Sequence, residues 1–163
     1  MSNFTILNLG PTIKGQSSIK GYEGMLEIMG FSYGMSIAVA PGMTNSERTV
    51  GKPHFSDISF SRYSDLATPS LMQACAGGTV IAGDTILTVA RLEDKGAVLP
   101  LITFTLKNVL ISSLSLSAGG DIPVENISLT YSHIEVVYHV QKTVGSPGGE
   151  SPFTFNVATN EAA

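Results

Sequence analysis

Charged residues are scarce in this sequence. Aspartate, glutamate, lysine and arginine make up 13% of its 163 residues, about half of the ~25% that is usual in globular proteins. A protein of this size normally relies on charged groups at its surface to stay soluble. The shortage therefore favours an assembly in which other subunits cover much of the surface over a monomer whose surface is merely rich in serine, threonine and glycine.

Other absences disfavour several classes of function. The net charge is −4 and lysine and arginine form no cluster, so no nucleic-acid partner is expected. Cys75 is the only cysteine, which rules out a disulfide framework and suggests a buried structural thiol. Residues 28–46 carry no charge, but their glycines, proline and serines indicate a strand and a loop, so we expect no stable membrane insertion. The first fifteen residues lack the pattern of a Sec-type signal peptide.

Residues that could carry out chemistry are few. The sequence has no GxSxG, HExxH or phosphate-binding glycine motif. The carboxylates Asp57, Asp65 and Glu135 are expected to be surface or capping groups. The three histidines, His54, His133 and His139, do not have the spacing of metal ligands. His133 and His139 lie on either side of a change of apolar parity, so they need not share a face of the strand. We therefore predict no catalytic, cofactor-binding or metal-binding residue, and no enzyme.

Residues 51–78 predict a strand followed by the one convincing helix of the chain. Ile58 and Phe60 alternate with polar residues, as in a half-buried strand. Thr68 is expected to cap the helix with its hydroxyl group, and Pro69 suits the first helical position. The glycines at 77 and 78 can adopt the left-handed turn that ends a helix. The predicted buried stripe consists of Leu71, Met72 and Cys75.

The rest of the chain is patterned as strands. A short first strand is expected over residues 4–7, and residues 25–39 alternate large and small side chains as one strand. Further strands are predicted over 85–92, in a long run over 102–117, and over 125–141, where apolar parity flips after Tyr131. Such a flip implies a bulge or bend that lets one strand serve two sheets. Residues 145–163 are expected to form a flexible tail or an added strand.

These patterns predict one mainly β domain over residues 1–163, a small β-barrel or orthogonal two-sheet sandwich with one short α-helix. The small face of the 25–39 strand is expected to meet solvent, a neighbouring backbone or a channel wall. Residues 40–53 form a long turn-rich loop, which is either solvated and flexible or an arm that bridges subunits.

The stretch FSDISFSRYSDLATPSLMQAC resembles the Hcp family, the haemolysin-coregulated proteins that build the inner tube of type VI secretion systems. Further ordered matches extend the resemblance over about residues 13–149. Phe31 and Tyr33 stand where the family often has two tryptophans, and the turn at 93–96 lacks the usual second glycine, which leaves the subgroup open. The motif positions with a structural role are Phe55, Asp57, Phe60, Tyr63, Asp65, Thr68, Pro69 and Leu71.

The resemblance implies a homohexameric ring that stacks into a tube, without a cofactor. A contractile sheath would expel this tube behind a VgrG-type spike, with small effectors carried in the lumen. The protein would be cytoplasmic before assembly and then secreted without a cleaved signal peptide. We expect the lumen to be lined by Gly30, Ser32, Gly34 and Ser36. The inter-subunit loop is expected to comprise Thr44, Asn45, Ser46, Glu47, Arg48, Thr49 and Val50.

Two alternatives stay open at this point. A tail-tube protein of a phage or another contractile injection machine would have similar architecture, and capsid genes rather than sheath and ATPase genes would lie beside it. A monomeric β-barrel that binds a small ligand would show a single-subunit mass in solution and an apolar cavity.

Overall fold

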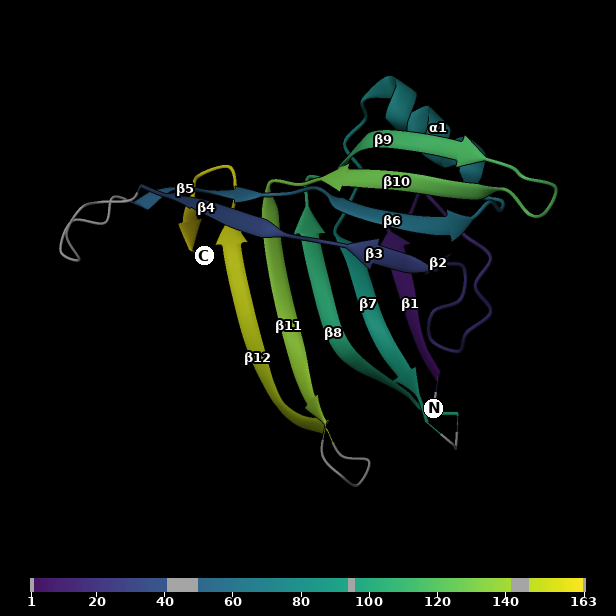
Figure 1. Cartoon of the computed structure of the whole chain (residues 1–163). Coiled ribbons are helices and arrows are strands. Elements are labelled where there is room, and N and C mark those ends of the chain that lie inside the picture. Colours follow the sequence, from purple (N-terminus) through teal and green to yellow (C-terminus); the bar gives the residue numbers. More distant parts are fainter. Residues whose placement is uncertain (1, 41–49, 94–95, 142–146, 163) are drawn as a thin grey trace.

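The computed structural model describes residues 2–40, 50–93, 96–141 and 147–162 (Figure 1). The predicted loop residues 44–49 lie outside these ranges. In chain order, the first elements are β1 Ser2–Leu9, β2 Leu26–Ile28, β3 Gly30–Ser32, β4 Met35–Val39, β5 Val50–Phe55, β6 Ile58–Tyr63 and α1 Thr68–Gly77. The later elements are β7 Thr85–Leu92, β8 Val98–Lys107, β9 Leu110–Ser117, β10 Val124–Thr130, β11 His133–Gln141, β12 Pro147–Asn156 and β13 Glu161–Ala162.

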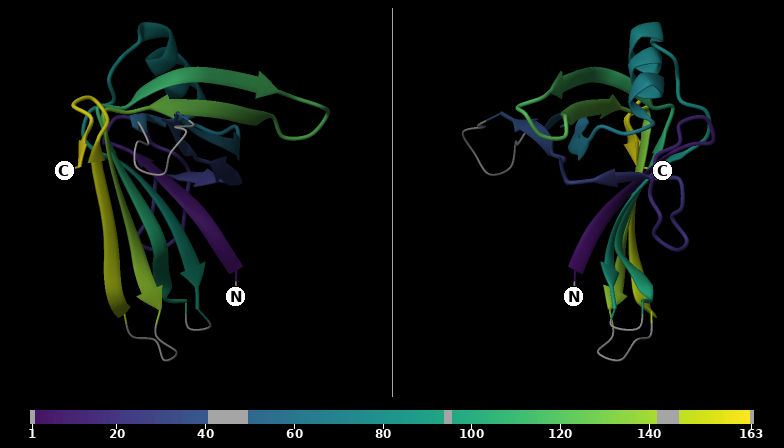
Figure 2. Two further views of the ribbon diagram at one scale, coloured as in Figure 1. Left: turned by 60° about the vertical axis from the view of Figure 1, so that its left-hand side comes forward. Right: turned by 90° about the vertical axis from the view of Figure 1, so that its right-hand side faces the viewer.

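The strands form two main sheets and a separate two-stranded arm. A seven-stranded sheet has the order β13-β12-β11-β8-β7-β1-β2, a four-stranded sheet has the order β3-β6-β10-β9, and β4 pairs only with β5. The strands of the four-stranded sheet run across those of the seven-stranded sheet, and the arm projects from one end of this arrangement (Figures 1 and 2). The predicted mainly β, two-sheet fold with one short helix is confirmed.

The core lies between the two sheets and under the helix. Alternate residues of each strand point inward, so both sheets contribute every second side chain. The seven-stranded sheet supplies Leu7, Leu87, Phe104, Leu106 and Ile134, and the four-stranded sheet supplies Ile58, Phe60, Ile111, Ile127 and Leu129. Aromatic contacts join the layers, since the rings of Phe31 and Tyr33 pack edge-on against Phe104 with centroids 5.6 and 5.7 Å apart.

The prediction of one strand over residues 25–39 is wrong. This segment forms three short strands, and each belongs to a different sheet: β2 pairs with β1, β3 with β6 and β4 with β5. The alternation of large and small residues is real, but it persists through two changes of direction. A pattern with a period of two defines faces and does not define the sheet to which each part belongs.

The long run over residues 102–117 also divides. Asn108 adopts a left-handed backbone conformation with φ of 52°, which asparagine tolerates better than most residues, and the chain leaves the seven-stranded sheet there to enter the other. The predicted bend after Tyr131 is confirmed, because β10 and β11 lie in different sheets. The two crossings touch: the Ser132 N–H donates to the Lys107 carbonyl (3.1 Å), and Asn108 Nδ2 donates to Ser132 Oγ (2.8 Å).

The helix ends as predicted and begins differently. Gly78 takes up the left-handed conformation with φ of 57°, and its N–H donates to the Cys75 carbonyl. Ala67 occupies the N-cap position without a side-chain cap. The predicted Thr68 cap is wrong, because the Thr68 hydroxyl donates to a glutamate of the four-stranded sheet instead.

The buried stripe of the helix is narrower than predicted. Leu71 is fully buried, Met72 is 40% exposed and Cys75 is half-buried. Only Leu71 is therefore a full core residue among the three, and the thiol of Cys75 is less enclosed than the sequence suggested.

The C-terminal residues pair with the large sheet. Strand β12 runs antiparallel to β11, placing Phe155 opposite Ile134 and Phe153 opposite Val136, and β13 pairs with the end of β12. The Phe155 ring also packs on Phe55 with centroids 4.8 Å apart.

Candidate lumen face and assembly arm

The outward face of the four-stranded sheet carries only small or uncharged polar residues over two complete rows. The strand register places the first row side by side across all four strands: Ser32, Ser59, Ser128 and Ser113. The second row runs parallel to it: Gly30, Ser61, Asn126 and Ser115. We call these eight positions the serine face.

The serine face is fixed by the apolar row that lies between its two rows. This row points to the opposite side of the sheet, into the core: Phe31, Phe60, Ile127 and Leu114. Because successive side chains alternate across a strand, burying this row commits its neighbours to the outer surface. The hydroxyl groups of Ser59 and Ser128 form a hydrogen bond of 2.9 Å, and the face forms a shallow depression of about 470 Å³.

Two of the four predicted lumen residues lie on the serine face and two lie elsewhere. Gly30 and Ser32 are part of the two rows. Gly34 connects β3 to β4, and Ser36 is in β4, opposite His54 of β5. The sequence pattern missed the remaining six members of the face: Ser59, Ser61, Ser113, Ser115, Asn126 and Ser128. Each alternates with an apolar neighbour, but their convergence on one sheet depends on long-range register.

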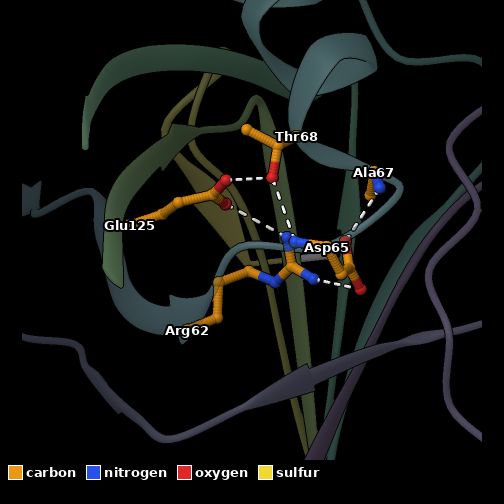
Figure 3. A network of polar contacts seen from close by, with 5 residues as sticks. All are labelled: Arg62, Asp65, Ala67, Thr68 and Glu125. Atoms are coloured by element: carbon orange, nitrogen blue, oxygen red, sulfur yellow. Dashed lines mark hydrogen bonds and ion pairs between the residues drawn. The ribbon is translucent and has the colours of Figure 1, made fainter. Parts of the chain in front are cut away.

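A buried ionic network lies on the inner side of the same sheet (Figure 3). Arg62 of β6 is directly opposite Glu125 of β10, and the two side chains are 1% and 0% exposed. Arg62 Nη1 donates to Glu125 Oε2 over 3.1 Å, and Arg62 Nη2 contacts Asp65 Oδ2 at 2.5 Å. The Thr68 hydroxyl donates to the other oxygen of Glu125. The network therefore ties the start of α1 to two strands of the four-stranded sheet.

The other motif residues have structural contacts or lie at the surface. Asp57 accepts a hydrogen bond of 2.7 Å from Ser112, at the bulge of β9. Pro69 is the second residue of the helix, and Phe60 is almost fully buried. Tyr63, by contrast, is 52% exposed at the end of β6.

The base of the β4–β5 arm is held by hydrogen bonds. Ser56 Oγ accepts from the Gly34 N–H (2.9 Å) and donates to the Gly34 carbonyl (2.7 Å), while the Ser56 carbonyl accepts from the Tyr131 hydroxyl (2.9 Å). Burial, together with the adjacent Tyr33, raises the pKa of Tyr131 far above its usual value. Burial also raises the pKa of Tyr33. Both phenols thus stay neutral in the folded protein at physiological pH.

The arm itself is exposed throughout β4. Met35, Ile37, Val39 and Val50 are each about half exposed. Val50, predicted as the end of the inter-subunit loop, is the first residue of β5 and lies opposite Val39.

The histidine and acidic side chains of the described residues do not gather into a catalytic or metal-binding cluster. His139 Nδ1 lies 3.3 Å from Glu150 Oε1, and its Nε2 lies 3.3 Å from Thr103 Oγ1. Within the described ranges, no three histidine, cysteine or acidic side chains gather closely enough to hold a metal ion. Over the same ranges, no helix has the length and apolar character needed to cross a membrane.

Comparison with known proteins identifies the class of protein to which the chain belongs. The family model described as "Type VI secretion system effector, Hcp" matches residues 5–138. "Protein hcp1" of Pseudomonas aeruginosa is 34% identical over 154 residues, covering 93% of each chain. The molecule is thus a component of a type VI secretion system.

The solved structures show the same fold. The structure of a type six secretion system protein matches with a TM-score of 0.88 at 22% identity, over 99% of this chain and 100% of that protein. Hcp1 from Salmonella typhimurium has a TM-score of 0.80 at 20% identity, with full coverage of both chains. The chain belongs to the Hcp family, whose members are structural proteins of the secretion tube and not enzymes.

Proposed function

We propose that six copies of this chain close head to tail into a ring, and that these rings stack into the tube with the serine face towards the lumen. The observation that supports this orientation most strongly is the absence of charge and bulk over the eight positions of the serine face. A channel wall made of such residues narrows the lumen little and attracts no particular sign of charge, so folded cargo can slide along it. The membership of the chain in the Hcp family supports the ring itself.

The β4–β5 arm is the proposed contact with a neighbouring subunit. Its apolar side chains are exposed in the isolated chain, and a solvent-facing apolar patch commonly marks a protein interface. A head-to-tail ring uses two different surfaces on each subunit and closes without a free end. This geometry suits a chain whose β4–β5 arm projects from one end (Figure 1).

The partners outside the ring follow from the same family. We infer that a contractile sheath surrounds the tube, that a VgrG-type spike tips it, and that small effectors travel in the lumen. The protein would be cytoplasmic until assembly and would then leave the cell with the tube, without a cleaved signal peptide. The family match favours this type VI assignment over a phage tail tube.

Cysteine labelling tests the orientation of the serine face. Ser115→Cys is placed in a Cys75→Ser background, and a maleimide coupled to a folded carrier protein too wide for the channel is added before and after assembly. We expect Ser115→Cys to react as a dissociated subunit and to be protected in stacked rings. The control, Met72→Cys on α1, lies on the other side of the sheet and should react in both states.

Two results would count against the proposal. Equal labelling of Ser115→Cys before and after assembly would place the serine face outside the tube. A single-subunit mass by light scattering at high concentration would favour the monomeric ligand-binding barrel.

In addition, Ser32→Gln should reduce retention of cargo while the hexamer stays intact, because it adds bulk to the first row of the face.

A further inference from the structure

The β4–β5 arm lacks a covering layer. Met35, Ile37 and Val39 are alternate residues of β4, so they lie on one face, and all three are exposed. A two-stranded ribbon has little stability of its own in water. The base of the arm is nevertheless fixed to the barrel by the Ser56 hydrogen bonds. The arm is therefore presented in a defined direction with an exposed apolar face, as is common at protein interfaces.

A pocket of about 330 Å³ lies at the other end of the four-stranded sheet. Strand β6 connects the two places, since it begins next to the base of the arm and ends at Tyr63 in the pocket wall (Figure 1). Met29 and Tyr63 contribute half-exposed apolar surface to this wall. Glu27 and Asp65 also line it. We call it the acidic pocket.

The charge of the acidic pocket complements that of the arm. The Arg62 guanidinium in the pocket wall is already paired with buried Glu125 and with Asp65. Together with the exposed Glu27, these groups give the pocket a net negative charge. The strands of the arm contain Lys52 and no acidic residue.

The polar pairing of the pocket wall is also incomplete. Arg62 Nε and Ser64 Oγ are buried and have no hydrogen-bond partner within the described part of the chain. Buried polar groups in folded proteins almost always have a partner, from protein or water. Both residues line the acidic pocket, and their unpartnered atoms lie beneath the surface that a docked chain would cover.

We propose that the β4–β5 arm of one subunit docks over the acidic pocket of the next subunit in the ring. The apolar face of the arm covers Met29 and Tyr63, and Lys52 lies against Glu27 and Asp65. Because the two surfaces lie at opposite ends of β6, the contact repeats from subunit to subunit and is heterologous. This inference rests on the proposed ring and specifies which two surfaces form it.

Paired cysteines test the contact directly. In a Cys75→Ser background, Ile37→Cys on the arm is combined with Met29→Cys at the pocket, and the assembled protein is oxidised mildly. We expect a ladder of disulfide-linked subunits up to the closed ring on a non-reducing gel. The control combines Ile37→Cys with Val80→Cys, which is equally exposed but follows the helix, and it should stay monomeric on the gel.

A charge exchange provides an independent measurement. Lys52→Glu and Glu27→Lys should each raise the subunit concentration at which rings half-dissociate by about tenfold, and the double variant should restore most of the loss. Lys107→Glu, on the seven-stranded sheet, is the matched control and should leave the rings unchanged.

The outcomes separate this contact from the ring as a whole. Intact rings without the Ile37–Met29 crosslink, or with no rescue in the double variant, would show that the arm docks elsewhere. Failure of the unmodified chain to form rings by native mass spectrometry would overturn the proposed function itself.

Discussion

Replacing Glu125 with glutamine should strongly destabilise the protein. The substitution keeps the size of the side chain but removes the charge that faces Arg62 across two strands, where both groups are at most 1% exposed. The two oxygens of the Glu125 carboxylate accept hydrogen bonds from the Thr68 hydroxyl and from Arg62. In glutamine, an NH₂ group with two donors replaces one of these acceptor oxygens. Arg62 would then keep only Asp65 as an ionic partner.

The magnitude follows from the burial of the pair. Breaking a buried ion pair by removing one partner costs about 3–5 kcal/mol, because the other charge is left in a poorly solvated place. For a chain of this length, each kcal/mol lowers the melting temperature by about 2–4 °C. The expected decrease in melting temperature is therefore about 6–20 °C. The loss of about 3–5 kcal/mol is itself a large part of the ~5–15 kcal/mol that stabilises a typical domain.

Thermal and urea unfolding, followed by circular dichroism on dissociated subunits, would measure this loss. Glu135→Gln is the control, since Glu135 is a half-buried carboxylate in β11 of the seven-stranded sheet, opposite Thr105, and the network lies on the other sheet. It should change stability by no more than about 0.5 kcal/mol. A loss below about 1 kcal/mol for Glu125→Gln would refute the reasoning, because it would mean that Arg62 is solvated or paired without Glu125.

Two further predictions concern the core and the tyrosines. Leu71→Ala should cost about 2–5 kcal/mol in unfolding free energy because its side chain is fully buried, whereas Met72→Ala should cost clearly less. The pKa values of Tyr33 and Tyr131 are raised by burial, so stability should fall as the pH rises above about 10, where the unfolded phenols ionise. Absorbance at 295 nm should show these two tyrosines titrating only on unfolding, and early titration of all five tyrosines would contradict this.

The sequence predicted the features that depend on local chemistry. The end of the helix followed from the glycines at 77 and 78, because the left-handed conformation is cheap for glycine. The bend between β10 and β11 followed from the change of apolar parity around Tyr131, because a strand cannot bury both of its faces against the same layer. Both signals lie within a few residues of the feature that they predict.

Features that depend on long-range pairing could not be predicted in the same way. The segment 25–39 keeps one alternation through three sheets, so its pattern concealed the two breaks. The serine face needs Ser59, Ser113 and Ser128 in register across three strands, and no local signal encodes that alignment. The position of Thr68 in the sequence suits a helix cap, but its hydroxyl group instead donates a hydrogen bond to Glu125, fifty-seven residues away.

The neighbouring crossings at Asn108 and Ser132 have a mechanical consequence. Each continues one strand of the seven-stranded sheet directly into the four-stranded sheet, and hydrogen bonds lock the two corners to each other. A force applied to one sheet is therefore transmitted to the other through covalent bonds, and the hydrogen-bonded corners resist sliding of the two layers past each other. A subunit built in this way moves as one rigid piece when a force acts on either sheet.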